Sequence, residues 1–462
     1  MTGRIGVARG TALYVGAVLG PGVLVLPALA VQAAGPASLL AWALMLAVSV
    51  PIAAAFAALG IRYPDSGGVA TFTRQAFGPG VGTVVGWWFY AAVPMGMVAG
   101  AMAGARYATT ALSTGPGAAA VIATGMLAAA YALNLVGLHL SGRLHLALTG
   151  GLCALLITVI VVSAPHIKAS RFTPFVPEGP AGVGSAAAVL FVAICGWEAA
   201  AHLAGEFTRP RRQLPIVAGA SLGIIAILYA GLAICTVGVL GASGGRSEVP
   251  LLRLLGPQGG VASVVTALCA LLLTFSACFT FIAAAARAGA ALGRDGAFPG
   301  WFAATGAGGV PWRSLAVQAG GAAVVAVAAL AAPTVVDVDL LMRAFSVLLA
   351  SVTLLGLAAA VRLLSSPLIR GGAAVGAVVV GGVAVCGGPL LILPAAVAVA
   401  ALTWRRHRPA QRDLPAVRPG PKPAGGTTSR RIAEVDVQPR RSYDLVNPAA
   451  RTGASGRTHR SP

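Results

Sequence analysis

The sequence predicts an all-α membrane protein with about twelve transmembrane helices. Three observations lead to this prediction: 57% of the 462 residues are apolar, the mean hydropathy is +0.86, and only 10% of the residues are charged. A soluble fold cannot bury so much apolar surface, whereas a bilayer can accommodate it. One span needs about 20 apolar residues, and about twelve such runs precede Trp404.

Residues 1–404 are therefore expected to form one transmembrane domain. The run that starts at Thr11 is long enough to span and lacks a cleavage site, so it is assigned to the first helix and not to a signal peptide. The expected spans are 11–33, 38–61, 82–105, 117–138, 143–163, 183–206, 214–240, 261–290, 314–332, 338–363, 372–387 and 389–404.

The basic residues predict the orientation of these spans. With the N-terminus in the cytoplasm, the inside loops before Trp404 carry 13 basic residues and the outside loops carry 6. Basic loops stay on the cytoplasmic side, so both termini are expected there. The formal charge of +20 is explained by this excess of basic residues on the cytoplasmic side. Nucleic acid is not an expected partner, because no basic face with stacking aromatics is present.

Residues 405–462 form a basic segment rich in Pro, Gly, Ser and Arg, with 13 basic and 4 acidic side chains. Such a composition cannot build a core, which predicts a disordered cytoplasmic tail. Contact with anionic lipid is one role for its charge, and a solvated tail that only holds the topology is the alternative.

The first span contains Gly20, Pro21 and Gly22 in succession. Pro21 removes a backbone donor and clashes with the preceding turn, while the flanking glycines ease unwinding. We expect the helix to break near the middle of the membrane, where irregular backbone is tolerated only against protein or a cavity. The N–H groups that open its second half suit a carboxylate. A simple proline kink is the alternative.

The sixth span carries a second expected break, at Gly196. Glu198 follows it deep inside an apolar run, and an isolated carboxylate in a span is costly and indicates function. Glu198, His202 and Glu206 have i, i+4, i+8 spacing and share one helical face. A Glu–His pair that satisfies only itself between helices is the structural alternative.

Broken helices at the first and sixth positions indicate two five-helix halves of inverted topology, each led by a broken helix. The first repeat is expected to cover residues 11–163 and the second 183–363, with two additional helices in 372–404. In such folds the site lies at the midplane between the breaks. Half-helix N–H groups there bind a carboxylate, and freed carbonyls bind an ammonium or a coupling ion.

Several stretches resemble, in the expected order, motifs of the amino acid–polyamine–organocation superfamily. Gly20-Pro21-Gly22 resembles its Gly-small-Gly signature in the first helix, and Gly196-Trp197-Glu198 resembles its Gly-aromatic-Glu in the sixth. Loop residues 63–68, 206–215 and 293–299 are also similar to superfamily motifs. Within the superfamily the chain looks closest to bacterial exporters of neutral amino acids such as methionine and the branched-chain residues.

The resemblance implies a LeuT-like fold and a transporter that moves a free amino acid across the bacterial cytoplasmic membrane by alternating access. It implies that the carboxylate lies near Gly20 and Gly22 and the ammonium near Ala193, Ile194 and Gly196. The expected substrate-binding residues are Val18, Leu19, Gly20, Pro21, Gly22, Val23, Phe191, Ala193, Ile194, Gly196 and Trp197.

Coupling and gating are assigned to Glu198 and His202, with H⁺ as the expected ion and no cofactor or metal. Some proton-coupled relatives carry a lysine in the fifth helix, but the stretch from Thr149 to Leu152 has none. Na⁺ is the weaker alternative. Ser276 and Thr280 would supply its oxygens, although such hydroxyls usually bond back to their own helix.

The residues around the breaks are mostly apolar, which favours a neutral, hydrophobic amino acid moved by efflux or exchange. Glu198 is the one acid nearby, so a cationic amino acid or polyamine remains an alternative. Trp87, Trp88 and Tyr90 form either an aromatic lid or an interfacial belt.

No cluster of His, Asp and Glu suggests an enzyme, and no ring of like groups suggests a channel. A receptor that binds its ligand without moving it stays open.

Overall fold

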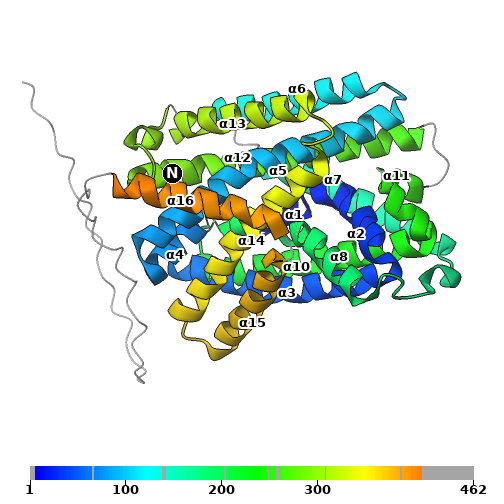
Figure 1. Ribbon diagram of the computed structural model, residues 1–462, viewed down its shortest axis with the longest axis horizontal. Coiled ribbons are helices and arrows are strands. Elements are labelled where there is room, and N and C mark those ends of the chain that lie inside the picture. Colours follow the sequence, from blue (N-terminus) through cyan, green and yellow to red (C-terminus); the bar gives the residue numbers. More distant parts are fainter. Residues whose placement is uncertain are drawn as a thin grey trace, which may run out of the picture. The chain divides into compact units, whose positions relative to one another are not determined.

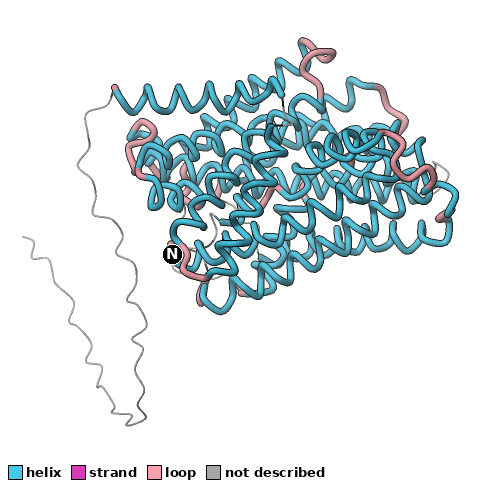
Figure 2. Tube along the Cα trace, turned by 60° about the horizontal axis from the view of Figure 1, so that its bottom comes forward, coloured by secondary structure: helices cyan, strands magenta, loops and turns pink. Residues whose placement is uncertain are grey.

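The computed structural model describes residues 6–64, 67–137, 142–201, 204, 207–247, 249–255, 261–306, 309–385 and 388–407. His202 and the predicted tail from residue 408 lie outside the described residues. All elements that the structure describes are helical (Figure 2). The α-helices are α1 (Val7–Leu19), α2 (Leu26–Ala34), α3 (Ser38–Arg62), α4 (Val69–Phe77), α5 (Pro79–Ala111), α6 (Pro116–Leu135), α7 (Gly142–Ser163), α8 (Gly179–Ile194), α9 (Trp197–Ala201), α10 (Pro210–Cys235), α11 (Pro250–Leu254), α12 (Val261–Arg294), α13 (Trp312–Ala331), α14 (Val338–Leu363), α15 (Pro367–Val385) and α16 (Ile392–Arg406).

Ten helical stretches of the described residues are long and apolar enough to cross a membrane. One of them, Leu26–Arg62, runs through α2, the 3-10 turn η2 (Gly35–Ala37) and α3. The apolar helices α1 and α8 are shorter, because each stops at an interruption and the chain continues as α2 or α9. The expected interruptions of the first and sixth spans are thus confirmed, and these elements together account for the predicted spans.

Two short helices were not predicted. α4 has 9 residues and α11 has 5, so neither forms an apolar run of the length used to identify a span. α4 lies between the second and third spans and packs against α5 and α14.

The long helix α5 is central to the fold. It contacts α4, α6, α12, α13, α14 and α16, and Figure 1 shows it running beside α12, with α6 and α13 along one edge. Glycines allow this close approach: a Cβ on Gly104 of α5 would lie 2.6 Å from Oγ1 of Thr274 in α12. Small residues bring membrane helices together in this way because lipid provides no hydrophobic force between them.

Pro94 removes one hydrogen bond from the α5 ladder. It has no N–H, so the carbonyl of Tyr90, four residues earlier, loses its helical donor. Gln318 of α13 replaces that donor, with Nε2 donating to the Tyr90 carbonyl at 2.7 Å. The Tyr90 hydroxyl in turn donates to the Ser314 carbonyl at 2.6 Å. α13 is therefore hydrogen-bonded to α5 at the position where α5 lacks one of its own helical hydrogen bonds.

Gln318→Leu is expected to lower the free energy of unfolding by about 1–3 kcal/mol, because it leaves the buried Tyr90 carbonyl without a donor. Reversible unfolding in mixed detergent micelles would measure the loss.

A Pro94→Ala background provides the control. It restores an N–H at position 94, so the cost of Gln318→Leu should fall to less than half of its value in the native background. Equal costs in both backgrounds would contradict this assignment of Gln318.

Candidate functional site

The first span breaks at Gly20, where the backbone turns to φ +31°. This conformation favours glycine. α1 ends at Leu19, and Pro21–Leu24 form the 3-10 turn η1 before α2 begins. Pro21 has no N–H, so Gly22 provides the first backbone donor of the turn, and this donor has no i→i+3 partner within it. No side chain caps the turn.

Two tyrosine hydroxyls bind carbonyls on either side of this break. Tyr229 of α10 donates to the Val18 carbonyl at 3.2 Å, and Tyr107 of α5 donates to the Leu24 carbonyl at 2.5 Å. Both tyrosines are fully buried. Neighbouring spans thus supply hydrogen-bond donors to carbonyls beside the break. The break is therefore stabilised by the rest of the fold.

The second span breaks at Cys195 and Gly196. α8 ends at Ile194, Gly196 adopts φ +140°, and α9 begins at Trp197. Within α8, the last carbonyls lack helical donors. Cys195 donates to two of these carbonyls. Its N–H donates to the Val192 carbonyl at 3.2 Å, and its Sγ donates to the Phe191 carbonyl at 3.4 Å. The carbonyls of Ala193 and Ile194 have no donor within α8.

The two breaks meet backbone to backbone. A Cβ added to Gly196 would lie 2.7 Å from both the Ala17 carbonyl oxygen and Val18 Cα. A cavity of about 20 Å³ adjoins this contact, which is room for roughly one or two waters. It is lined by Ala17, Val18, Gly20, Gly22, Gly96, Met97, Val192, Cys195, Phe281, Met342 and Phe345. None of these residues is charged.

Glu198 bridges the second break to α14. Its Oε2 accepts a hydrogen bond from the Gly196 N–H at 2.8 Å, and its Oε1 accepts one from the Thr353 hydroxyl. The side chain is 1% exposed and is not among the residues that line the cavity. The Gly196 N–H can only donate, so Oε2 must accept, whereas the Thr353 hydroxyl can donate to Oε1 or accept from it.

The expected substrate-binding residues occupy three kinds of position. Val18, Gly20 and Gly22 line the cavity. Pro21 and Gly196 form the breaks through their backbone. The remaining residues are buried beside the breaks and are not among the lining residues: Leu19, Val23, Phe191, Ala193, Ile194 and Trp197. The Trp197 Nε1 donates to the Ser49 hydroxyl at 2.9 Å, which ties α9 to α3.

Sequence reasoning missed the walls contributed by α5, α12 and α14. Gly96 follows Pro94 closely in α5, and this pair of helix-disfavouring residues was a usable signal. Phe281 and Phe345 are apolar residues in apolar spans, so nothing in the sequence distinguishes them. Their rings form an edge-to-face pair with centroids 5.8 Å apart. The Phe345 ring covers Gly96, where an added Cβ would lie 2.5 Å from it.

The two hydroxyls considered for Na⁺ differ in their bonding. Thr280 Oγ1 donates back to the Ser276 carbonyl at 2.9 Å, as membrane-helix hydroxyls commonly do. Ser276 Oγ is buried without a hydrogen-bond partner in the described part of the chain. Thr149, in the stretch where some relatives carry lysine, donates to the Ala12 carbonyl at 3.2 Å.

The aromatic residues of the third span hold elements together away from the cavity. Trp87 Nε1 donates to the Ala297 carbonyl at 3.1 Å, and Trp88 Nε1 donates to the Pro394 carbonyl at 2.7 Å. The rings of Trp87 and Tyr90 each pack against Phe298, with centroids 5.0 Å apart. None of these three residues, for which a lid and an interfacial belt were both considered, lines the cavity at the breaks.

Comparison with known proteins adds a family match. The amino acid permease family matches residues 5–417. The chain is 34% identical to the uncharacterized amino acid permease YecA of Bacillus subtilis, over 64% of this chain and 70% of that protein. It is also 34% identical to the L-methionine/branched-chain amino acid exporter YjeH of Escherichia coli, over 51% of this chain and 56% of that protein.

The fold also resembles a solved structure. The manganese transporter of Eremococcus coleocola superposes with a TM-score of 0.60 at 13% identity, covering 86% of this chain and 92% of that one. An identity this low carries the fold alone. The expected LeuT-like architecture, an all-helical membrane fold with broken first and sixth helices, is confirmed.

Gly196→Ala is expected to destabilise the protein strongly. The positive φ alone costs about 1–3 kcal/mol for a non-glycine residue, and overlap with Ala17 and Val18 adds to this cost. The thermal midpoint in detergent should fall.

Gly184→Ala in α8 is the matched control. Gly184 is exposed, and an added Cβ would meet nothing within 4 Å, so alanine should leave the midpoint unchanged or raise it slightly. Similar midpoints for the two variants would refute the close contact between the breaks.

Proposed function

Since this chain belongs to the amino acid permease family, a family of multi-pass membrane transporters and not of enzymes, we propose that it carries neutral, apolar amino acids by alternating access. The observation that supports this substrate class is the uncharged lining of the cavity where the two breaks meet. A charged substrate side chain in such surroundings would need a counter-charge. The relative YjeH, named as an exporter of L-methionine and branched-chain amino acids, agrees with this choice.

Main-chain groups at the two breaks are the proposed ligands for the backbone of the substrate. The N–H of Gly22, at the start of η1, suits the carboxylate, because helix N-termini attract anions. The carbonyls of Ala193 and Ile194, at the end of α8, suit the ammonium, because helix C-termini attract cations. The substrate side chain would then face Met97, Phe281 and Phe345.

The small volume of the cavity supports a cycle with distinct open and closed states. A free amino acid needs several times the roughly 20 Å³ present, so helices must separate before the substrate enters. We assign this structure to a closed state of that cycle. The Phe345 ring covers Gly96 and lines the cavity, so its rotation would enlarge the space.

A cationic substrate is less well supported than a neutral one. Glu198 is the acid that would neutralise it, but both of its oxygens accept hydrogen bonds from Gly196 and Thr353. Glu198 is also not among the residues that line the cavity, so it does not present its charge to a substrate there.

The same bonds support a proposal of proton coupling through Glu198. Protonation converts one carboxylate oxygen from an acceptor to a donor, so Glu198 can no longer accept from both Gly196 and Thr353 in the same way. A proton on Oε1 would therefore make the Thr353 hydroxyl accept where it now donates, which changes the link between the second break and α14. We propose that this biases the transporter between its states, in a cytoplasmic membrane with both termini inside.

Counterflow in proteoliposomes tests the proposed substrate class. Vesicles loaded with unlabelled leucine or methionine should accumulate the labelled amino acid from outside. Accumulation of arginine or putrescine alone would redirect the proposal to cationic substrates. Binding without accumulation of any amino acid or amine would favour a receptor.

Glu198→Gln is expected to make the transport rate insensitive to pH across the acidic-to-neutral range, because glutamine cannot take up the proton. Asp339→Asn, at an exposed carboxylate paired with Arg343, is the control and should keep the wild-type profile. A wild-type pH profile in Glu198→Gln would exclude this residue as the proton site.

A further inference from the structure

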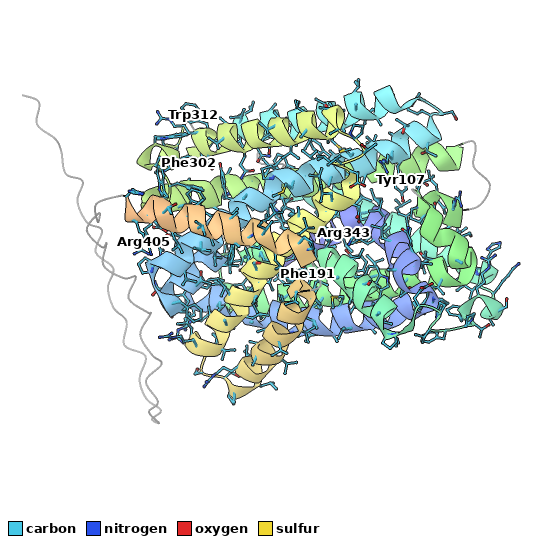
Figure 3. All side chains as sticks on the ribbon, viewed as in Figure 1. Tyr107, Phe191, Phe302, Trp312, Arg343 and Arg405 are labelled. Carbon is cyan, nitrogen blue, oxygen red and sulfur yellow. The ribbon has the colours of Figure 1, made fainter. Side chains whose placement is uncertain are left out.

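One wall of the cavity at the breaks is an aromatic ring that lies in a notch formed by a glycine. Phe345 of α14 lies against Gly96 of α5, and both residues line the cavity. A Cβ added to Gly96 would lie 2.5–2.7 Å from three carbons of the Phe345 ring. Arg343 marks this part of α14 in Figure 3. The ring therefore occupies space that exists only because residue 96 has no side chain.

A second aromatic residue lies beside this ring. Phe281 of α12 also lines the cavity, and its ring meets the Phe345 ring edge to face, with centroids 5.8 Å apart and planes at 72°. Aromatic rings prefer this arrangement because the positive edge of one ring faces the negative face of the other. Gly96 and Phe281 thus form two sides of a site for one aromatic ring, and Phe345 occupies it.

The other large side chains of the lining are aliphatic or contain a thioether: Val18, Met97, Val192 and Met342. Methionine adapts to irregular shapes, so aliphatic or thioether substrate side chains can pack among these residues. A rigid, flat ring fits the notch at Gly96 better. The Phe345 ring can turn aside to admit a substrate, but an empty notch forfeits packing. A substrate ring would therefore compete with Phe345 for one site.

We infer that Phe345 is a specificity-determining residue that excludes aromatic amino acids by occupying the ring site between Gly96 and Phe281. This inference rests on the proposed transport of neutral amino acids and adds the side-chain shape that is refused. Aliphatic and thioether side chains, which do not need the notch, are accepted.

Counterflow of leucine and phenylalanine, measured side by side, tests this role. The wild type should favour leucine by about tenfold in kcat/KM, and Phe345→Leu should raise the phenylalanine-to-leucine ratio about tenfold, because the substrate ring takes the vacated site. Phe275→Leu is the matched control. Phe275 stacks on Phe279 of the same helix and lies outside the lining, so the wild-type ratio should persist. Equal use of both substrates by the wild type, or an unchanged ratio in Phe345→Leu, would overturn the inference.

Gly96→Ala provides a test in the opposite direction. The added Cβ would push the Phe345 ring toward the cavity, so the leucine-to-alanine ratio of kcat/KM should fall about tenfold. In a Phe345→Leu background the ring is absent, and the same change should alter this ratio less than about twofold. Equal losses in both backgrounds would show that Gly96 does not act through Phe345 and would overturn the ring site.

Thermal stabilisation by substrate separates failure of this inference from failure of the transport proposal, because it reads binding alone. Leucine should raise the thermal midpoint of the wild type more than phenylalanine does, and Phe345→Leu should reverse this order. These shifts without leucine accumulation would support the ring site and contradict transport. Leucine accumulation with the same order of shifts in both proteins would overturn the ring site and leave transport standing.

Discussion

The contact between Gly196 and the backbone of Ala17 and Val18 is the constraint on which the centre of the molecule depends. Two membrane helices are interrupted at the same place, and no side chain separates them. Interrupted helices expose polar backbone groups that the bilayer cannot satisfy. Partners must therefore come from within the protein. Other spans supply the hydroxyls of Tyr107 and Tyr229, and the sixth span supplies the carboxylate of its own Glu198.

These partners join the breaks to the rest of the fold. Tyr107 belongs to the central helix α5, Tyr229 to α10, and Glu198 reaches Thr353 of α14. A shift of any of these spans alters the support of an interrupted helix. The cavity walls come from the same helices, since Gly96 lies on α5 and Phe345 on α14. Movement of the scaffold and the shape of the cavity are thus mechanically linked, as the proposed alternating-access cycle would require.

The parts of this arrangement that could be predicted are those in which the residue type itself determines the backbone. Gly20, Pro21 and Gly196 indicated both breaks because glycine and proline change the local energy of a helix, and Glu198 was conspicuous because a carboxylate in an apolar run is costly. Phe281 and Phe345 could not be identified, since a phenylalanine in a span looks the same whether it faces lipid or a cavity. Thr353 lies 155 residues from Glu198, and no local pattern reveals such a partner. α4 is too short to be detected by hydrophobicity.

The pairing of Pro94 with Gln318 also constrains how this sequence can change over time. Loss of the glutamine first would leave a buried carbonyl without a donor. Loss of the proline first would give the Tyr90 carbonyl a second donor, which its two lone pairs can accept. Mutational drift away from the pair therefore has a preferred order, beginning at position 94. Descendants that retain the proline should retain an amide at position 318, whereas those that have lost the proline are free to vary there.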